Sequence, residues 1–239
     1  MATLIPKIDP ATITNDGERI VATALLQAFD KHTLVFHSFP WLRRRKLDGN
    51  RREPLQQGEI DFVLLNRELG MLVLEVKGGD VRFDAESGEA WRAHGSGRVQ
   101  ELKESPFEQV RRNYHNLRDI IFDYPQFRLI GGEKRLLPFN SGYAVVLPTH
   151  RHTGPLPPDA DPDILIDADG VEEIENGCEK RWNGGQAARS ARISNSTNPI
   201  GKPHRKLYCP YSKSCRCSGA RWKSRKKNSN TSPTIRNIC

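Results

Sequence analysis

Apolar residues recur along the chain with two different periods, which predict a mixture of helices and strands. Residues 14–30 carry apolar side chains at helical spacing, and Asn15 followed by Glu18 has the spacing of a capping box. The same spacing opens a second predicted helix, residues 105–123, with a proline in its first turn. Both helices are amphipathic, so each is expected to cover one face of a shared core.

Shorter apolar segments between and after these helices predict strands. They are bounded by Gly, Pro, Asn and Asp, as strands commonly are. The order of the elements is α-β-β-β-α-β, which predicts an α/β fold with a mixed central sheet flanked by helices. The predicted strands are residues 33–39, 60–66, 71–76, 142–148 and 163–167, and a more exposed hairpin is predicted over residues 81–93, turning at residues 86–88 with Trp91 packing back.

The strands 60–66 and 71–76 are joined by a short polar loop and predict a β-hairpin. If the loop is symmetric about Glu68, residues whose numbers add to 136 face one another. Directly opposed residues in an antiparallel pair have Cβ atoms about 4.5–5.5 Å apart. The predicted pairs are Leu65 with Met71, Val63 with Val73, and Asp61 with Glu75.

This register gathers three charged side chains on one face of the hairpin. Asp61 faces Glu75, and strand alternation places Lys77 on the same face as Glu75. Two opposed carboxylates repel unless one is protonated or a cation lies between them. The set therefore fits a hard, oxygen-preferring cation such as Mg²⁺, with the lysine left to act on a substrate. The alternative is that the acids are solvated at a sheet end, or that Lys77 forms an ordinary ion pair.

The charge of the chain is unevenly distributed. Residues 1–176 hold 22 basic and 28 acidic residues, a net charge of −6, whereas residues 177–239 hold 15 and 1, a net charge of +14. The second segment is also poor in aliphatic residues, so we expect a disordered basic tail. It is either an arm that binds phosphates nonspecifically or a sequence translated out of frame or truncated. The predicted organisation is an N-terminal extension, 1–13, a domain, 14–176, with its core in 14–150, and the tail, 177–239.

The cysteines and the N-terminus bear on the cellular compartment. All five cysteines lie at or beyond residue 178, and an odd number without a secretory signal argues against a secreted disulfide framework. Their spacing does not match a zinc ribbon. No apolar run is long enough to span a membrane. We therefore expect a cytoplasmic protein without a membrane partner.

The residues singled out above resemble the nuclease-related domain, NERD, of the PD-(D/E)xK superfamily. The resemblance covers residues 14–150 and extends towards 176. Its most specific elements are Asp61 in Gly-Glu-Ile-Asp and the Glu75-Val76-Lys77 segment, while Glu59 stands where the family usually has glutamine. Further matching positions are Glu18, Trp91 and the helix start 105–109.

The resemblance implies a restriction-endonuclease-like fold and Mg²⁺-dependent cleavage of phosphodiester bonds, with Mn²⁺ as a substitute. It favours DNA as substrate and a role in DNA processing or repair, as an endo- or exonuclease. Asp61, Glu75 and the Val76 carbonyl would hold the metal. Lys77 would orient or deprotonate water, or stabilise the transition state. The supporting residues would be Glu18 and Gln109, and the residues expected to bind the DNA backbone are Arg43, Arg44, Arg45, Lys46, Arg51 and Arg52.

Two other functions remain open at this point. One is a non-catalytic nucleic-acid-binding or scaffold module that has kept the fold. The other is a truncated fragment of a larger protein, because members of this family often carry a helicase or kinase domain after the nuclease-like part. In that case the chain would act with a helicase-type partner or a lost C-terminal domain.

Overall fold

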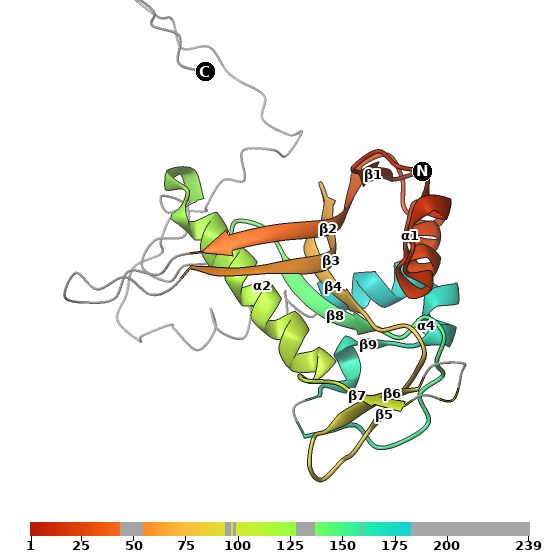
Figure 1. The fold of residues 1–239 in the computed structure, drawn as a ribbon. Coiled ribbons are helices and arrows are strands. Elements are labelled where there is room, and N and C mark those ends of the chain that lie inside the picture. Colours follow the sequence, from red (N-terminus) through yellow and green to blue (C-terminus); the bar gives the residue numbers. More distant parts are fainter. Residues whose placement is uncertain (44–54, 94–96, 98, 128–136, 159, 183–239) are drawn as a thin grey trace, which may run out of the picture. The chain divides into compact units, whose positions relative to one another are not determined.

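A six-stranded mixed sheet forms the centre of the described structure (Figure 1). The computed structural model describes residues 1–43, 55–93, 97, 99–127, 137–158 and 160–182. All of these lie in the first of two units of the chain, Met1–Thr197, and the second unit, Asn198–Cys239, lies outside the described residues. Most of the predicted tail is therefore not described.

The strand order in the sheet is β1-β2-β3-β4-β8-β9. The pairs β2/β3 and β3/β4 are antiparallel, whereas β1/β2, β4/β8 and β8/β9 are parallel, so the predicted mixed sheet is confirmed. Strand β1 lies within the segment assigned to an N-terminal extension. The strands are β1 (Thr3–Ile5), β2 (Thr33–Arg43), β3 (Gln56–Asn66), β4 (Gly70–Val76), β8 (Ser141–Val146) and β9 (Leu165–Ile166).

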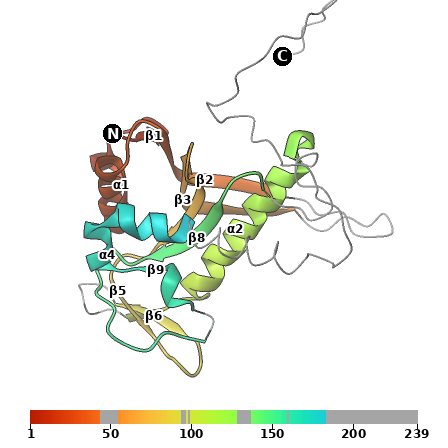
Figure 2. The same ribbon diagram turned by 180° about the vertical axis from the view of Figure 1, so that it is seen from behind.

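Helices cover both faces of this sheet, as Figures 1 and 2 show from opposite sides. One face is covered by three helices: α1 (Asp16–Ala28), α4 (Ala168–Glu172) and a following helix, residues 174–182. Helix α2 (Pro106–Asp123) crosses the other face. The described part also contains two 3₁₀ turns, η1 (Pro10–Thr12) and η3 (Pro162–Ile164). None of the helices in the described part is long and apolar enough to cross a membrane.

The two long helices begin where the sequence predicts. Asn15 Oδ1 accepts hydrogen bonds from the backbone N–H groups of Gly17 and Glu18, and Ser105 Oγ accepts one from Phe107. These caps satisfy N–H groups that have no partner within the helix. Local side-chain chemistry therefore sets both start points.

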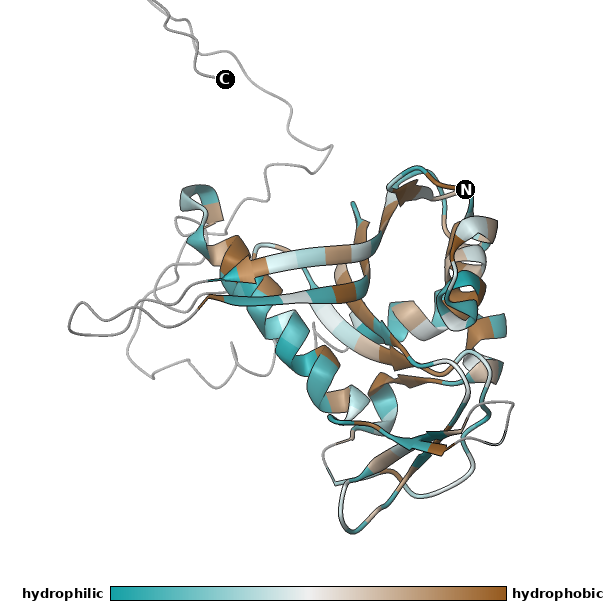
Figure 3. Ribbon diagram, viewed as in Figure 1, coloured by the Kyte–Doolittle hydropathy of each residue, from teal (hydrophilic) through white to brown (hydrophobic). Residues whose placement is uncertain are grey.

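The buried core has one half on each face of the sheet. On the α1 face, Phe62, Leu64, Leu72 and Leu74 pack beneath α1, and on the α2 face, Val63, Met71 and Val73 pack beneath α2. Figure 3 shows the hydrophobic colour concentrated in these central strands. Because both faces are covered, β4 reads as a nearly continuous apolar segment rather than an alternating one.

The predicted register of the hairpin is confirmed. Leu65 pairs with Met71, Val63 with Val73 and Phe62 with Leu74, and the numbers of each pair add to 136. The hydrogen-bonded ladder ends at Phe62, immediately before Asp61. Asp61 therefore lies where the two strands begin to separate.

Side-chain alternation is interrupted at the same place. Ile60 packs on the α2 face and Phe62 on the α1 face, although residues two apart on a strand normally share a face. On the neighbouring strand, Val35 packs on the α1 face and Trp41 on the α2 face, and Ser38 between them has φ of 50°. This left-handed conformation is unfavourable for a residue other than glycine. The break at Ser38 and Asp61 turns the outer ends of β2 and β3 over α2.

The outer part of β2 and β3, residues 39–43 and 56–60, forms an arm that binds α2 through polar contacts. Trp41 Nε1 donates to Asn113 Oδ1 at 3.2 Å, and Asn113 Nδ2 donates to the Glu59 carbonyl at 3.1 Å. Arg43 pairs with Asp119 at 2.7 Å. Residues 41–43 and 56–57 are therefore strand residues, held by α2 and by each other.

Replacing Gly58 with alanine is expected to destabilise the arm. A Cβ atom at Gly58 would lie 2.6 Å from the indole ring of Trp41, which is itself fixed by Asn113. Overpacking of this kind costs about 1–3 kcal/mol, measured as the free energy of unfolding in urea. Gly154→Ala is the matched control, because its nearest neighbour is a His152 side-chain atom at 3.9 Å. Equal stability of the two variants would contradict the packing described here.

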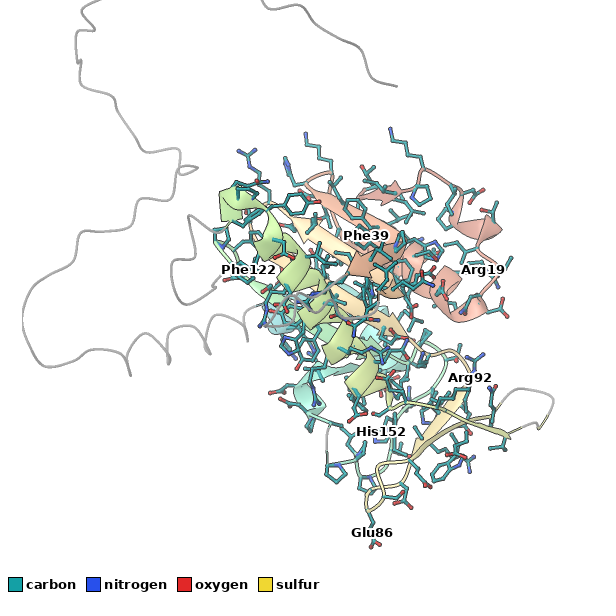
Figure 4. All side chains as sticks on the ribbon, turned by 60° about the vertical axis from the view of Figure 1, so that its left-hand side comes forward. Arg19, Phe39, Glu86, Arg92, Phe122 and His152 are labelled. Carbon is teal, nitrogen blue, oxygen red and sulfur yellow. The ribbon has the colours of Figure 1, made fainter. Side chains whose placement is uncertain are left out.

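A second, three-stranded sheet lies beside the central one. It consists of β5 (Asp80–Phe83), β6 (Ala90–Ala93) and β7 (Val99–Glu101), and its first two strands confirm the predicted hairpin. Figure 4 shows Glu86 at the tip of this hairpin, pointing away from the rest of the molecule. The small sheet directly follows β4, so it is attached at the end of the strand that carries Glu75.

The core extends past the predicted domain boundary at residue 176. Residues 174–182 are helical, and both Cys178 and Trp182 are fully buried on the α1 face. Trp182 meets Phe29 edge-to-face, with ring centroids 5.7 Å apart. The first six residues of the segment assigned to the tail thus belong to the folded unit.

Candidate active site

Glu75 is an acid on a strand that is otherwise apolar. Every residue of β4 is buried, and the carboxyl side chain of Glu75 is only 1% exposed. Alternation from Val73 places it on the α2 face. Its Oε1 atom accepts a hydrogen bond from Lys77 Nζ at 2.7 Å, whereas Oε2 is buried and makes no hydrogen bond to the other described residues. A buried carboxylate oxygen without a donor is unfavourable unless a cation or proton occupies the site.

Asp61 reaches across from β3 towards the same place. Its Oδ2 atom accepts a hydrogen bond from the backbone N–H of Val76 at 2.7 Å. The interruption of the ladder beyond Phe62 leaves that N–H available to the side chain. This hydrogen bond holds the Asp61 carboxylate at Val76, the residue between Glu75 and Lys77. The predicted register placed Asp61 opposite Glu75, close to this position.

The segment that carries Lys77 is fastened to the strand beside β4. The Lys77 backbone N–H donates to the Val146 carbonyl at 2.9 Å, and Thr149 Oγ1 accepts from Gly79 N–H at 2.8 Å. Gly79 has φ of 90°, which favours glycine at this turn. The ammonium side chain is 17% exposed, so it lies at the border between the buried acids and solvent.

The surroundings oppose full ionisation of the two acids. The pKa of Glu75 is raised to about 8, first by burial and then by the negative charge of Asp61, while Lys77 acts in the opposite direction. Burial likewise raises the pKa of Asp61 to about 6, against the stabilising hydrogen bond from Val76. Raised pKa values of this kind are common at catalytic and metal-binding sites, where burial and neighbouring like charges are brought together.

Glu18, at the start of α1, approaches Asp61. It accepts a hydrogen bond from Asn15 Nδ2, and its Oε2 atom lies 2.7 Å from Nε2 of His37 on β2. Its negative charge is one of the causes that raise the pKa of Asp61. The predicted supporting acid is therefore brought close to the site, and His37 is a partner that sequence analysis did not identify.

The other predicted residues have different positions. Gln109 is half-buried in the first turn of α2, and its side chain makes no hydrogen bond within the described residues. Arg43 was predicted to bind nucleic acid, but its guanidinium is 11% exposed and engaged by Asp119 and Asn116. The remaining predicted backbone-binding residues, Arg44, Arg45, Lys46, Arg51 and Arg52, lie outside the described residues.

The donor set fits a hard divalent cation. Asp61 and Glu75 supply carboxylate oxygens, the atoms that Mg²⁺ prefers. Glu75 Oε2 has no hydrogen-bond partner among the described residues, and the pKa values of both acids are raised. A cation bound at this position would compensate the negative charge of the two carboxylates. In the described part of the chain, His, Cys, Asp and Glu side chains do not gather in groups of three or more that could hold a metal by themselves. Any further ligands would therefore have to come from backbone carbonyls, water or the substrate.

Comparison with known families shows the family to which the chain belongs. The family model for the nuclease-related domain matches residues 13–140, more than half of the chain. The chain belongs to the nuclease-related domain family, NERD. The matched range contains Glu18, Asp61, Glu75 and Lys77. Searches of curated proteins and of solved structures gave no significant match.

Family membership makes the chain nuclease-related and confirms the resemblance drawn from its motifs. The NERD match ends at residue 140, just before β8 begins. The structure nevertheless pairs β8 with β4 over six residues, including Glu75 with Val145. Residues beyond the NERD match therefore support the strand on which the site is built.

Proposed function

We propose that this chain is a Mg²⁺-dependent nuclease domain that cleaves phosphodiester bonds in DNA. The observation that carries the proposal is the buried Glu75 and the half-buried Asp61 beside it, with Lys77 Nζ 2.7 Å from one oxygen of Glu75. Two acids at the separating ends of two strands provide oxygen ligands for a cation, and Lys77 supplies a partly exposed ammonium beside them. Membership in NERD supports the same reaction class.

Each of the three residues has a distinct task in this proposal. Asp61 and Glu75, with the Val76 carbonyl, would hold the cation, and the Val76 N–H keeps Asp61 in place. A bound Mg²⁺, or Mn²⁺ in its place, would supply a water nucleophile of lowered pKa and neutralise charge on the phosphate. Lys77 lies at the solvent border, where its ammonium would stabilise the negative charge that develops on the phosphoryl oxygens.

Cleavage assays on the full-length chain test this function. Labelled single-stranded and double-stranded DNA, and RNA of the same sequence, would be incubated with Mg²⁺, Mn²⁺ or EDTA. The proposal predicts DNA cleavage that requires either metal and stops with EDTA. Binding of DNA without cleavage under all conditions would replace it with a non-catalytic binding module. RNA cleavage alone would correct the substrate.

Metal affinity is expected to rise with pH. Below its raised pKa of about 8, Glu75 carries a proton that a cation must displace, and below about 6 Asp61 does so as well. The Kd for Mn²⁺ should therefore fall by up to about tenfold per pH unit between pH 6 and 8, and level off above pH 8. Calorimetry in two buffers of different ionisation enthalpy measures both the Kd and the protons released. The isosteric Glu75→Gln variant should lose most of this slope, and a pH-independent Kd in the parent would contradict the assignment.

A further inference from the structure

His37 occupies a position on β2 that strand alternation gives to the apolar core. It pairs with Phe62 on the α1 face and lies against the Phe62 ring, with ring centroids 5.1 Å apart and the ring planes tilted by 39°. Its side chain is only 11% exposed. A buried imidazole requires hydrogen-bonding partners. The partner here is Glu18, at 2.7 Å from His37 Nε2 and 19 residues earlier in the chain.

Glu18 is held at both carboxylate oxygens. Oε1 accepts from Asn15 Nδ2 and Oε2 contacts His37, and the carboxylate is 16% exposed. A capping box would instead direct the carboxylate back to the backbone N–H of the N-cap residue. Asp16, in the same helical turn, lies on the surface and is 78% exposed. A helix needs only a nearby acid to stabilise its positive end. Stabilisation of the helix terminus therefore does not account for the hydrogen bond between Glu18 and His37 of β2.

The Glu18–His37 pair is connected to the site through residues that adjoin Asp61 and Lys77. Phe62, which supports the imidazole, is the neighbour of Asp61 on β3. Gly17, the neighbour of Glu18, packs against Gly78, the neighbour of Lys77, so closely that a Cβ atom on Gly17 would lie 3.0 Å from Gly78 Cα. The start of α1 is thus packed against the segment that follows β4, and from there the negative charge of Glu18 acts on Asp61.

We propose that His37 is a positioning residue that holds the carboxylate of Glu18 towards Asp61, so that a third negative charge contributes to cation binding at the site. The inference rests on the function proposed above, and it concerns the imidazole's contact with Glu18 rather than any contact with the substrate. Without this contact, Glu18 would remain tied only to Asn15, in the exposed first turn of α1. Partners of this kind orient groups at metal centres, and their loss typically weakens metal binding by about 10- to 100-fold.

Binding of Mn²⁺ to the metal-free, full-length protein without DNA provides the test. His37→Ala is expected to raise the Kd for Mn²⁺ about tenfold. His37→Gln keeps a side-chain N–H donor and should retain most of the affinity. In a double-mutant cycle, His37→Ala should add nothing to the loss caused by Glu18→Gln, because both remove the same interaction. The controls are His32→Gln, an exposed histidine, and Asp16→Asn, the exposed acid of the same helical turn.

Two results would overturn the inference. Parent-like Mn²⁺ affinity in folded His37→Ala would show that Glu18 does not need the imidazole, and additive losses in the cycle would show that the two residues act separately. Crystal structures of His37→Ala and His37→Gln distinguish this failure from failure of the proposed function. If the parent binds no Mn²⁺, the nuclease proposal fails. Independently of that result, a Glu18 carboxylate that keeps its position in the His37→Ala crystal structure would refute the positioning role of His37.

Discussion

Replacement of Lys77 with methionine is expected to slow DNA cleavage by about 100- to 1000-fold, the usual effect of removing one group that stabilises transition-state charge. Methionine retains the length and apolar stem of lysine and removes the ammonium. The Glu75 carboxyl then loses its hydrogen bond at Oε1 and a positive charge that lowers its pKa. Single-turnover rates at saturating Mg²⁺ measure the effect on the chemical step. Lys103→Met, at an exposed position before α2, is the matched control.

Asp61→Asn separates loss of function from loss of fold. Asparagine can still accept the hydrogen bond from Val76 N–H, but it lacks the charge that would hold a cation. Because the pKa of Asp61 is raised from 3.8 to about 6 in the folded state, ionisation of Asp61 lowers stability progressively as the pH rises between these values, and the full loss is present above about pH 6. The variant should therefore be at least as stable as the parent at pH 8 while cleavage falls at least about 100-fold. A cleavage rate near that of the parent in either Asp61→Asn or Lys77→Met would contradict the assigned site.

Trp182→Ala is expected to have the largest effect on stability. The indole is fully buried, lies on the α1 face with Cys178 and Ile174, and meets Phe29 edge-to-face. Truncation of a buried aromatic side chain to alanine costs about 3–5 kcal/mol, a large part of the stability of an ordinary domain. The free energy of unfolding in urea measures it.

The control for this experiment is Tyr124→Ala, an aromatic residue that is 55% exposed at the end of α2. Its substitution should change stability by no more than about 0.5 kcal/mol. A chain ending at residue 176 removes Cys178 and Trp182 together and is expected to be at least as unstable as Trp182→Ala. Parent-like stability of that shorter chain would show that the folded unit ends where composition placed its boundary.

The hairpin that carries the site could be predicted residue by residue. A short loop fixes the register, and a shift by one residue would move every side chain to the opposite face. Leu65–Met71 and Val63–Val73 follow from this symmetry. Asp61 lies just past the last pair of the ladder and reaches the backbone next to Glu75 through the Val76 N–H. The helix starts at Asn15 and Ser105 were predictable because capping depends on residues close in sequence.

Features that depend on distant contacts could not be predicted. The interruption of alternation at Ser38 and Asp61 has no local signature, because it requires α2 to receive the arm of β2 and β3. Average composition over residues 177–239 conceals a short helix whose Cys178 and Trp182 are buried. Glu18 and His37 are 19 residues apart on different elements. The signal available in the sequence was a histidine within the predicted strand 33–39.

Anomalous diffraction from a crystal of the protein soaked in Mn²⁺ tests most directly whether Asp61 and Glu75 form a metal centre. The account predicts a peak bound by Asp61 and Glu75, close to the Val76 carbonyl, and no such peak in Asp61→Asn crystals treated alike. Mn²⁺ bound elsewhere in the parent, with Lys77 still on Glu75 and nothing between the two acids, would contradict it.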